Sequence, residues 1–167
     1  MTGASGGRFT PLAVLGRGGG GTVERVHDAR RGAEVALKRL RGADRALEAA
    51  LRREHRLLTG LRHPSLVIPL ELGRDDEGLY LVSPLADGDD FVTHCRGSWL
   101  RIASAAPQLL SALRYLHERG LTHGDLSPAN VRVAPSGRLR LIDFGLAGLE
   151  GEPLGRGVPR GASARAE

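Results

Sequence analysis

The stretch HGDLSPANVRV, residues 123–133, decides how this sequence is interpreted. It contains the only asparagine of the chain, Asn130, five residues after an aspartate, Asp125. The chain also has a single lysine, Lys38 in VALK, among 24 lysine and arginine residues. Because this composition suggests a bias against lysine and asparagine, the one residue of each type that is present is a candidate for a required role.

Composition indicates an ordinary globular protein. The 167 residues can form one domain with a real core, and 41% hydrophobic with 26% charged residues argues against disorder. The net charge is +5, but the arginines are interspersed with acids, as in RREHR and GRDDEG, which disfavours a nucleic-acid partner. The single Cys95 excludes an internal disulfide.

The sequence predicts no membrane segment and a cytoplasmic location. No stretch reaches the roughly 18 apolar residues of a membrane span. The start, MTGASGGRFT, lacks the charged-then-apolar order of a signal peptide.

Hydrophobic periodicity predicts a small sheet with one inserted helix in the first 85 residues. Strands are expected at 9–16, 23–29, 33–40, 65–72 and 78–85. The helix is expected from Asp44, a suitable N-cap, to Leu61, with Gly60 as its stop. The glycine-rich run GRGGGGT, residues 16–22, predicts a tight loop between the first two strands.

After a polar link at 85–90 the pattern becomes helical. Residues 99–120 predict a long amphipathic helix whose leucines 109, 113 and 116 share one face. Residues 121–130 predict a loop, and VRVAP and RLRLIDF predict two short strands around a Ser-Gly turn. Beyond Gly145 the chain is rich in glycine, proline and arginine and shows no periodic pattern.

Several residues have side chains or backbones suited to phosphate chemistry. Glycines 16, 18 and 21 form G-x-G-x-x-G between two strands, where backbone N–H groups can approach phosphates, although a plain flexible loop has the same composition. Lys38 on the next strand can reach phosphate oxygens, or be a surface lysine. Glu54 can pair with Lys38, or be a solvated helix charge.

Two aspartates and the asparagine complete the set. Asp125 follows a helix and can accept a proton from an incoming hydroxyl group. Asn130 and Asp143 offer oxygen ligands of the kind that Mg²⁺ prefers. Each of these residues is also a common turn former, but together with the upstream elements they occur in one order along the chain.

That order resembles the protein kinase superfamily, and within it the bacterial eukaryotic-like serine/threonine protein kinases. The family's glycine loop, V-A-I-K lysine, helix glutamate, H-R-D-x-x-x-x-N and D-F-G correspond here to GRGGGG, VALK, Glu54, HGDLSPAN and DFG. The resemblance covers about residues 9–159. It implies an α+β fold with a five-stranded antiparallel N-lobe sheet, one helix, and an incomplete, mainly helical C-lobe.

The resemblance also implies domain boundaries and residue roles. The N-lobe would span 9–83, the hinge 84–88 and a partial C-lobe 89–150, flanked by a flexible start at 1–8 and a degenerate activation segment at 151–167. Asp125, as the base, and Lys38, which would hold the ATP α/β-phosphates and pair with Glu54, would be the catalytic residues, while Asn130 and Asp143 would hold Mg²⁺. The ATP site would comprise Leu15, Gly16, Gly18, Gly21, Val23, Ala36, Lys38, Glu54, Ser83, Leu85 and Asp90.

Three departures from the family pattern affect the functional interpretation. Gly124 replaces the arginine that reads an activation-loop phosphate, which predicts that such phosphorylation does not switch the protein on. Ser127 replaces a lysine near the γ-phosphate. The sequence also ends without the A-P-E motif and the helices that follow it in kinases. This predicts that helix 99–120 leaves its leucine face uncovered and that the C-terminal half is fragile.

Three functions therefore compete. The first is Mg-ATP-dependent transfer to a hydroxyl of an unknown protein substrate. The second is a small-molecule phosphotransferase of the aminoglycoside or choline kinase type, which Gly124 fits better. The third is a non-catalytic ATP-binding module.

Overall fold

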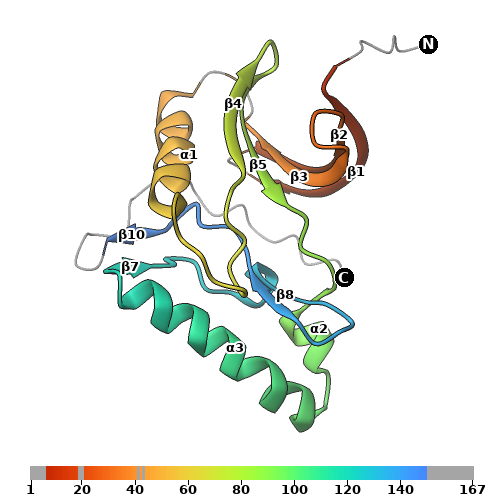
Figure 1. Ribbon diagram of the computed structural model, residues 1–167, viewed down its shortest axis with the longest axis vertical. Coiled ribbons are helices and arrows are strands. Elements are labelled where there is room, and N and C mark those ends of the chain that lie inside the picture. The colour runs from red at the N-terminus through yellow and green to blue at the C-terminus, as the bar shows by residue number, and fades with distance from the viewer. Residues whose placement is uncertain (1–6, 19–20, 41, 43, 150–167) are drawn as a thin grey trace, which may run out of the picture. The chain divides into compact units, whose positions relative to one another are not determined.

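The computed structural model describes residues 7–18, 21–40, 42 and 44–149 (Figure 1). These residues divide into two compact units. The first unit contains the described residues up to 49 together with 70–85, and the second contains 50–69 and 86–149.

The first unit is built on a five-stranded antiparallel sheet, as the sequence predicted. The strand order is β1-β2-β3-β5-β4. Its strands are β1 (Phe9–Gly18), β2 (Gly21–Asp28), β3 (Ala33–Arg39), β4 (Glu71–Asp75) and β5 (Gly78–Pro84).

Alternation along the strands separates the two faces of this sheet. Val35 and Leu37 point to a core that also contains Val26, Tyr80 and Val82. Because side chains alternate along a strand, Ala36 and Lys38 lie on the opposite face. Two residues of the VALK motif, Val35 and Leu37, therefore face the core, and the other two, Ala36 and Lys38, lie on the face that is predicted to bind ATP.

Helix α1 (Arg45–Leu58) follows β3 and begins and ends close to the predicted positions. The Asp44 carboxylate accepts hydrogen bonds from the backbone N–H groups of Ala46 (2.8 Å) and Leu47 (3.3 Å), as an N-cap residue does. After the helix, Gly60 has φ +88°, which suits the left-handed conformation that ends many helices.

The predicted strand at 65–72 is wrong over most of its length, because β4 begins only at Glu71. The preceding residues Ser65, Leu66 and Val67 are buried in the second unit instead. Val67 N–H donates to the Leu141 carbonyl (3.0 Å), and Leu141 N–H donates to the Ser65 carbonyl (2.8 Å). A short apolar run has no period that distinguishes a strand from such a buried segment.

The second unit combines two helices with short strands. The helices are α2 (Phe91–Cys95) and α3 (Trp99–His117), and Pro128–Asn130 forms a 3₁₀ turn, η1. The strands are β6 (Asp89–Asp90), β7 (Leu121–Thr122), β8 (Val131–Val133), β9 (Leu139–Leu141) and β10 (Gly148–Leu149). Strands β6, β8 and β9 form one small sheet in that order, and β7 pairs with β10.

Helix α3 buries its leucine face inside the second unit, contrary to the prediction that this face is uncovered. Leu116 is 1% exposed, and Leu109 and Leu113 pack against the same core as Val133 and Leu139. Apolar side chains remain exposed elsewhere on the helix, namely Trp99 (75%), Leu100 (80%) and Leu110 (64%).

Strands β8 and β9 form a hairpin with one apolar and one basic face. Val131, Val133, Leu139 and Leu141 are at most 2% exposed in the core of the second unit. The side chain of Gln108 on α3 fixes the turn, because its amide donates to the Gly137 carbonyl (2.8 Å) and accepts from Leu139 N–H (3.0 Å).

The second of these strands is shorter than predicted. It ends at Leu141 rather than Phe144. Asp143 has φ +56°, a left-handed conformation that a continuing strand does not contain.

Candidate functional site

The first unit brings four of the predicted ATP-site residues onto one face of its sheet. Val23 lies opposite Lys38, and Ala36 lies opposite Ser83. Directly paired residues of antiparallel strands point to the same face, and residues two apart on one strand do as well. This face is the one opposite the core of the first unit.

The glycine motif lies where β1 and β2 meet. Gly18 pairs with Gly21, and Gly16 pairs with Val23. Gly21 has φ +136°, and a Cβ atom there would lie 2.1 Å from the Arg39 carbonyl oxygen, so only glycine fits. Leu15 lies at a register shift and is 53% exposed.

The second unit brings the predicted metal ligands to one end of the β8–β9 hairpin. Val131 pairs with Leu141, and Ile142 N–H donates to the Asn130 carbonyl (2.8 Å). Asn130 immediately precedes β8, and Asp143 comes two residues after β9. The antiparallel register therefore places Asn130 and Asp143 at the same end of the hairpin.

Asn130 also binds the loop that carries Asp125. Its Nδ2 donates to the Asp125 carbonyl (2.8 Å) and to Asp125 Oδ2 (3.3 Å). The 3₁₀ turn η1 closes this loop, and Asn130 N–H donates to the Ser127 carbonyl (3.1 Å). Since Nδ2 faces Asp125, the Asn130 amide can present its oxygen to a cation.

His123 supports this loop from the core, a role that sequence reasoning missed. It is 3% exposed; its Nδ1 accepts from Asp125 N–H (3.3 Å), and its Nε2 lies 3.1 Å from the Ile142 carbonyl. These contacts fix the tautomer with hydrogen on Nε2. Burial lowers the pKa of His123, although Asp143 and Asp125 act in the opposite direction, so the imidazole is neutral near pH 7.

Gly124 occupies a position in which the backbone admits no side chain. Its φ is +78°, and a Cβ atom there would lie 2.0 Å from the Leu146 carbonyl oxygen. An arginine would therefore require this loop to change shape. The glycine in place of the arginine of the family's H-R-D motif is thus required by the backbone conformation of this loop.

Asp143 projects from a constrained turn. Its φ is +56°, it is exposed, and Gly145 N–H donates to its Oδ1 (3.3 Å). The next residue, Phe144, is 2% exposed and packs on His123 with ring centroids 4.7 Å apart. The buried phenyl ring therefore anchors the exposed carboxylate, a link that the spacing of DFG alone did not reveal.

Three further predicted site residues lie in other environments. Glu54 is 5% exposed on α1, and because it belongs to the second unit and Lys38 to the first, their pairing stays a prediction. Asp90 is the N-cap of α2, where its carboxylate accepts from Thr93 N–H (2.9 Å) and the Thr93 hydroxyl (2.7 Å). These bonds lower the pKa of Asp90, and its contact with ribose stays a prediction. Leu85 ends the first unit.

The donor set of the second unit suits a magnesium ion that is shared with substrate. Within residues 7–149, apart from the positions left undescribed, no three His, Cys, Asp or Glu side chains gather as metal ligands. Mg²⁺ is often held by only one or two carboxylates, with phosphate oxygens and waters completing its shell. One carboxylate, Asp143, beside one amide oxygen, Asn130, matches that pattern.

The helices also bear on membrane association. In the described part of the chain, none is both long enough and apolar enough to cross a bilayer.

Comparisons with known proteins agree with this geometry. The protein kinase domain family matches residues 9–154. A probable serine/threonine-protein kinase of Streptomyces coelicolor is 35% identical over 88% of this chain, and a DNA damage-responsive serine/threonine-protein kinase of Deinococcus radiodurans is 36% identical over 86%. Human mitogen-activated protein kinase 12 is 36% identical over 83%.

The matched region is a small part of those proteins. The alignments cover 24% of the Streptomyces protein, 23% of the Deinococcus protein and 41% of the human one. The chain thus spans about a quarter of the length of the two bacterial relatives.

Proposed function

The chain belongs to the protein kinase family, and on that premise we propose that it takes part in Mg-ATP-dependent phosphoryl transfer to a serine or threonine hydroxyl of a protein. The observation that carries the proposal is the Asn130–Asp125 hydrogen bonding at the hairpin end that also bears Asp143. These three side chains supply a base and two cation ligands in one place.

In this proposal Asp125 accepts the proton of the attacking hydroxyl group. The bond from Asn130 Nδ2 holds the Asp125 carboxylate in place, and the buried, neutral His123 holds the backbone of the same residue. A carboxylate fixed in this way needs no rearrangement when the hydroxyl arrives.

Asn130 and Asp143 would hold the Mg²⁺ ion, and Lys38 would hold ATP phosphates from the first unit. Bound Mg²⁺ would neutralise charge that develops on the phosphate oxygens. Ala36 and Val23, on the same sheet face as Lys38, would contact the adenine ring, with Ser83 at the adjoining strand. Gly16, Gly18 and Gly21 would let backbone N–H groups approach the phosphates.

The proposed acceptor is a protein hydroxyl group. The named relatives are protein kinases, which supports a protein acceptor. Gly124 keeps the small-molecule alternative in view, since HGD is typical of such enzymes as well. Ser127, in place of the family's lysine, predicts a slow transfer step.

Calorimetric titration of the chain with Mg-ATP tests the site, alongside Asp143→Ala and Asp125→Asn. We expect binding by the parent chain, its loss in Asp143→Ala, and its retention in Asp125→Asn, because Asp125 acts on the acceptor and not on the nucleotide. Asp76→Asn, in the exposed β4–β5 turn, is the matched control and should bind like the parent.

Transfer of radiolabelled phosphate to a basic protein or to an aminoglycoside then separates the alternatives. Transfer to the protein that is lost in Asp125→Asn supports the proposal. Nucleotide binding with no transfer to either acceptor would favour the non-catalytic module, and nucleotide binding that persists in Asp143→Ala would refute the assigned metal ligands.

A further inference from the structure

The basic face of the β8–β9 hairpin contains charge that the proposed function does not use. Arg132 lies opposite Arg140, and Ala134 N–H donates to the Arg138 carbonyl, so all three arginines lie on the face opposite the buried valines and leucines. Asp90 on β6 lies opposite Arg132, and the Arg132 charge helps to lower its pKa.

Arg138 and Arg140 have no comparable acidic partner. Within the described part of the chain, neither guanidinium group forms an ion pair or a hydrogen bond. Arg140 is only partly exposed, yet it lies two residues along the strand from a second arginine. Two guanidinium groups so close repel each other, and an anion between them would remove that repulsion.

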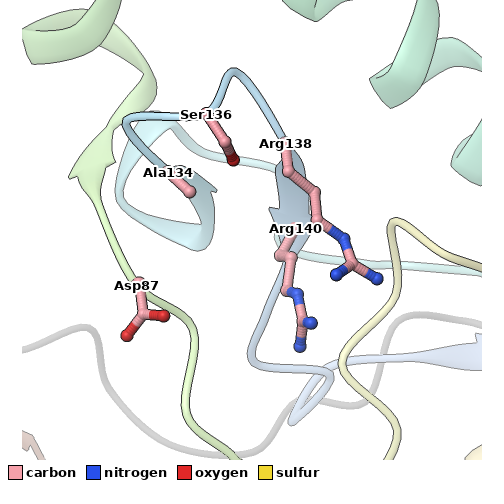
Figure 2. Close-up of a pocket in the computed structure, with 5 residues that line it drawn as sticks. All are labelled: Asp87, Ala134, Ser136, Arg138 and Arg140. Carbon is pink, nitrogen blue, oxygen red and sulfur yellow. The ribbon is translucent and has the colours of Figure 1, made fainter.

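These two arginines line a cavity of about 160 Å³ together with Asp87, Ala134 and Ser136. Figure 2 shows both guanidinium groups on one side, the Asp87 carboxylate across the hollow, and the Ser136 hydroxyl at the hairpin turn above it. A water molecule takes about 30 Å³ in the liquid, so the cavity has room for one phosphoryl group and its neighbouring atoms.

The walls of this cavity are held in place before any ligand binds. Gln108 bonds both sides of the turn, and Gly137 N–H donates to the Ala134 carbonyl (2.8 Å). Below the arginines, Leu139 and Leu141 are fully buried. A site on a fixed hairpin loses little conformational freedom when a ligand binds.

From these features we propose that the cavity binds a phosphorylated serine or threonine side chain of a peptide. A phosphate monoester carries a charge of about −2 near pH 7, which matches the two arginines. A ligand with a single carboxylate would neutralise only one of the two arginines. The Ser136 hydroxyl supplies a further donor.

Asp87 favours a peptide over free phosphate. A carboxylate on the opposite wall repels a bare dianion but pairs with a cationic side chain. A peptide with an arginine near its phosphorylated residue offers both charges. The ligand class is therefore a phosphopeptide with a basic flank.

Fluorescence anisotropy on the full chain tests the proposal, with the labelled probe Ala-Ala-Arg-Ala-phosphoserine-Ala-Ala and its unphosphorylated form. Saturating Mg-ADP is present throughout, so that the probe cannot report on the nucleotide site. We expect the phosphorylated probe to bind at least about tenfold more tightly, and Arg138→Gln and Arg140→Gln each to weaken it by about tenfold, which is about 1.4 kcal/mol.

Arg132→Gln is the matched control, because it removes the same charge from the same face outside the cavity. It should change the affinity by less than about twofold, given that Asp90 already faces Arg132. Asp87→Asn should weaken the arginine-containing probe but not a probe with alanine in place of that arginine. Circular dichroism of every variant verifies the fold.

Three results would overturn the proposal. Equal binding of the phosphorylated and unphosphorylated probes would remove phosphate recognition. An equal loss in Arg132→Gln would show general electrostatic attraction and no defined site. Inorganic phosphate that displaces the probe at a concentration near the probe's own dissociation constant would show a simple anion site, for which the peptide is unnecessary.

Discussion

The ion cluster around Arg8 offers the sharpest test of what holds the first unit together. Arg8 Nε and one terminal nitrogen donate to the two Asp28 oxygens (2.8 and 2.7 Å), and its terminal nitrogens also donate to Glu71. The Asp28 side chain is 0% exposed and that of Arg8 is 21% exposed. Arg8→Gln would therefore leave a buried carboxylate without its main counter-charge.

The expected cost follows from this geometry. Removal of one partner of a buried ion pair costs about 3–5 kcal/mol. Arg31 Nε remains 3.3 Å from Asp28, and Arg30 N–H still donates to it (3.0 Å), so we expect the lower end, about 3 kcal/mol. Arg25→Gln is the control, since its pair with Glu34 is 45% and 41% exposed and should contribute less than about 1 kcal/mol.

Hydrogen exchange followed by mass spectrometry resolves the effect locally. The only tryptophan, Trp99, belongs to the second unit, so its fluorescence does not follow this change. A loss of about 3 kcal/mol corresponds to about a hundredfold change, because each factor of ten is about 1.4 kcal/mol. Amides of β1 and β2 should therefore exchange about a hundredfold faster in Arg8→Gln than in the parent chain. Exchange no faster than in Arg25→Gln would refute the assignment of Arg8 as the structural partner of Asp28.

The same cluster predicts an acid limit for this protection. Hydrogen bonds from Arg8 lower the pKa of Glu71 to about 2 from its usual 4.5. A carboxylate with a depressed pKa in the folded state stabilises it fully above the unfolded value and loses that effect as the pH falls. Protection of β1 and β2 should therefore decline between about pH 4.5 and 2 in the parent chain, and less steeply in Arg8→Gln.

Two further predictions concern the loop of Asp125. Because burial lowers the pKa of His123, the unfolded state takes up a proton at a higher pH than the folded state does, and thermal stability should fall below about pH 6.5. The dependence of melting temperature on pH should be flatter in His123→Gln, and an unchanged dependence would contradict this role. Gly124→Ala should lower the free energy of unfolding, followed by circular dichroism, by more than about 2 kcal/mol, because the new side chain meets a carbonyl oxygen. Gly97→Ala (φ +63°), with no atom near its Cβ, should lower it by about 1–2 kcal/mol. Equal losses would show that the loop relaxes around the new side chain at residue 124.

Strands with regular alternation were predictable from the sequence, and segments fixed by distant contacts were not. Val35 and Leu37 alternate with Ala36 and Lys38, so the period-2 signal specified both the strand and its faces. The run before Glu71 is mostly apolar without a period, and its pairing is an isolated parallel bridge between Leu66 and Leu141, far along the chain, which the local sequence does not encode. Short elements such as α2 depend on one cap and carry little periodic signal.

The sequence indicated which residues could carry the chemistry of the site but not which residues support them. Asp125, Asn130 and Asp143 were predicted as site residues because their spacing in sequence matches a known order, and the hairpin register explains why that spacing brings two of them to one end. His123 and Phe144 were visible as parts of the same motifs, but their burial and mutual packing depend on the fold. The Arg8–Asp28–Glu71 cluster joins residues from three places in the chain and left no local pattern.

The phosphate site proposed on the β8–β9 hairpin lies at a different place from the one that the family's H-R-D arginine would supply at position 124. The family's arginine at that position reads a phosphate, but here the backbone of residue 124 excludes any side chain. Phosphate recognition at that loop would require a conformational change that displaces the Leu146 carbonyl. By contrast, Arg138 and Arg140 lie on a hairpin fixed by Gln108, and they need no rearrangement to receive an anion. If phosphorylation regulates this protein, we expect the added phosphate to act at the hairpin, so that Arg138→Gln abolishes the response and Arg132→Gln, which lies outside the cavity, does not.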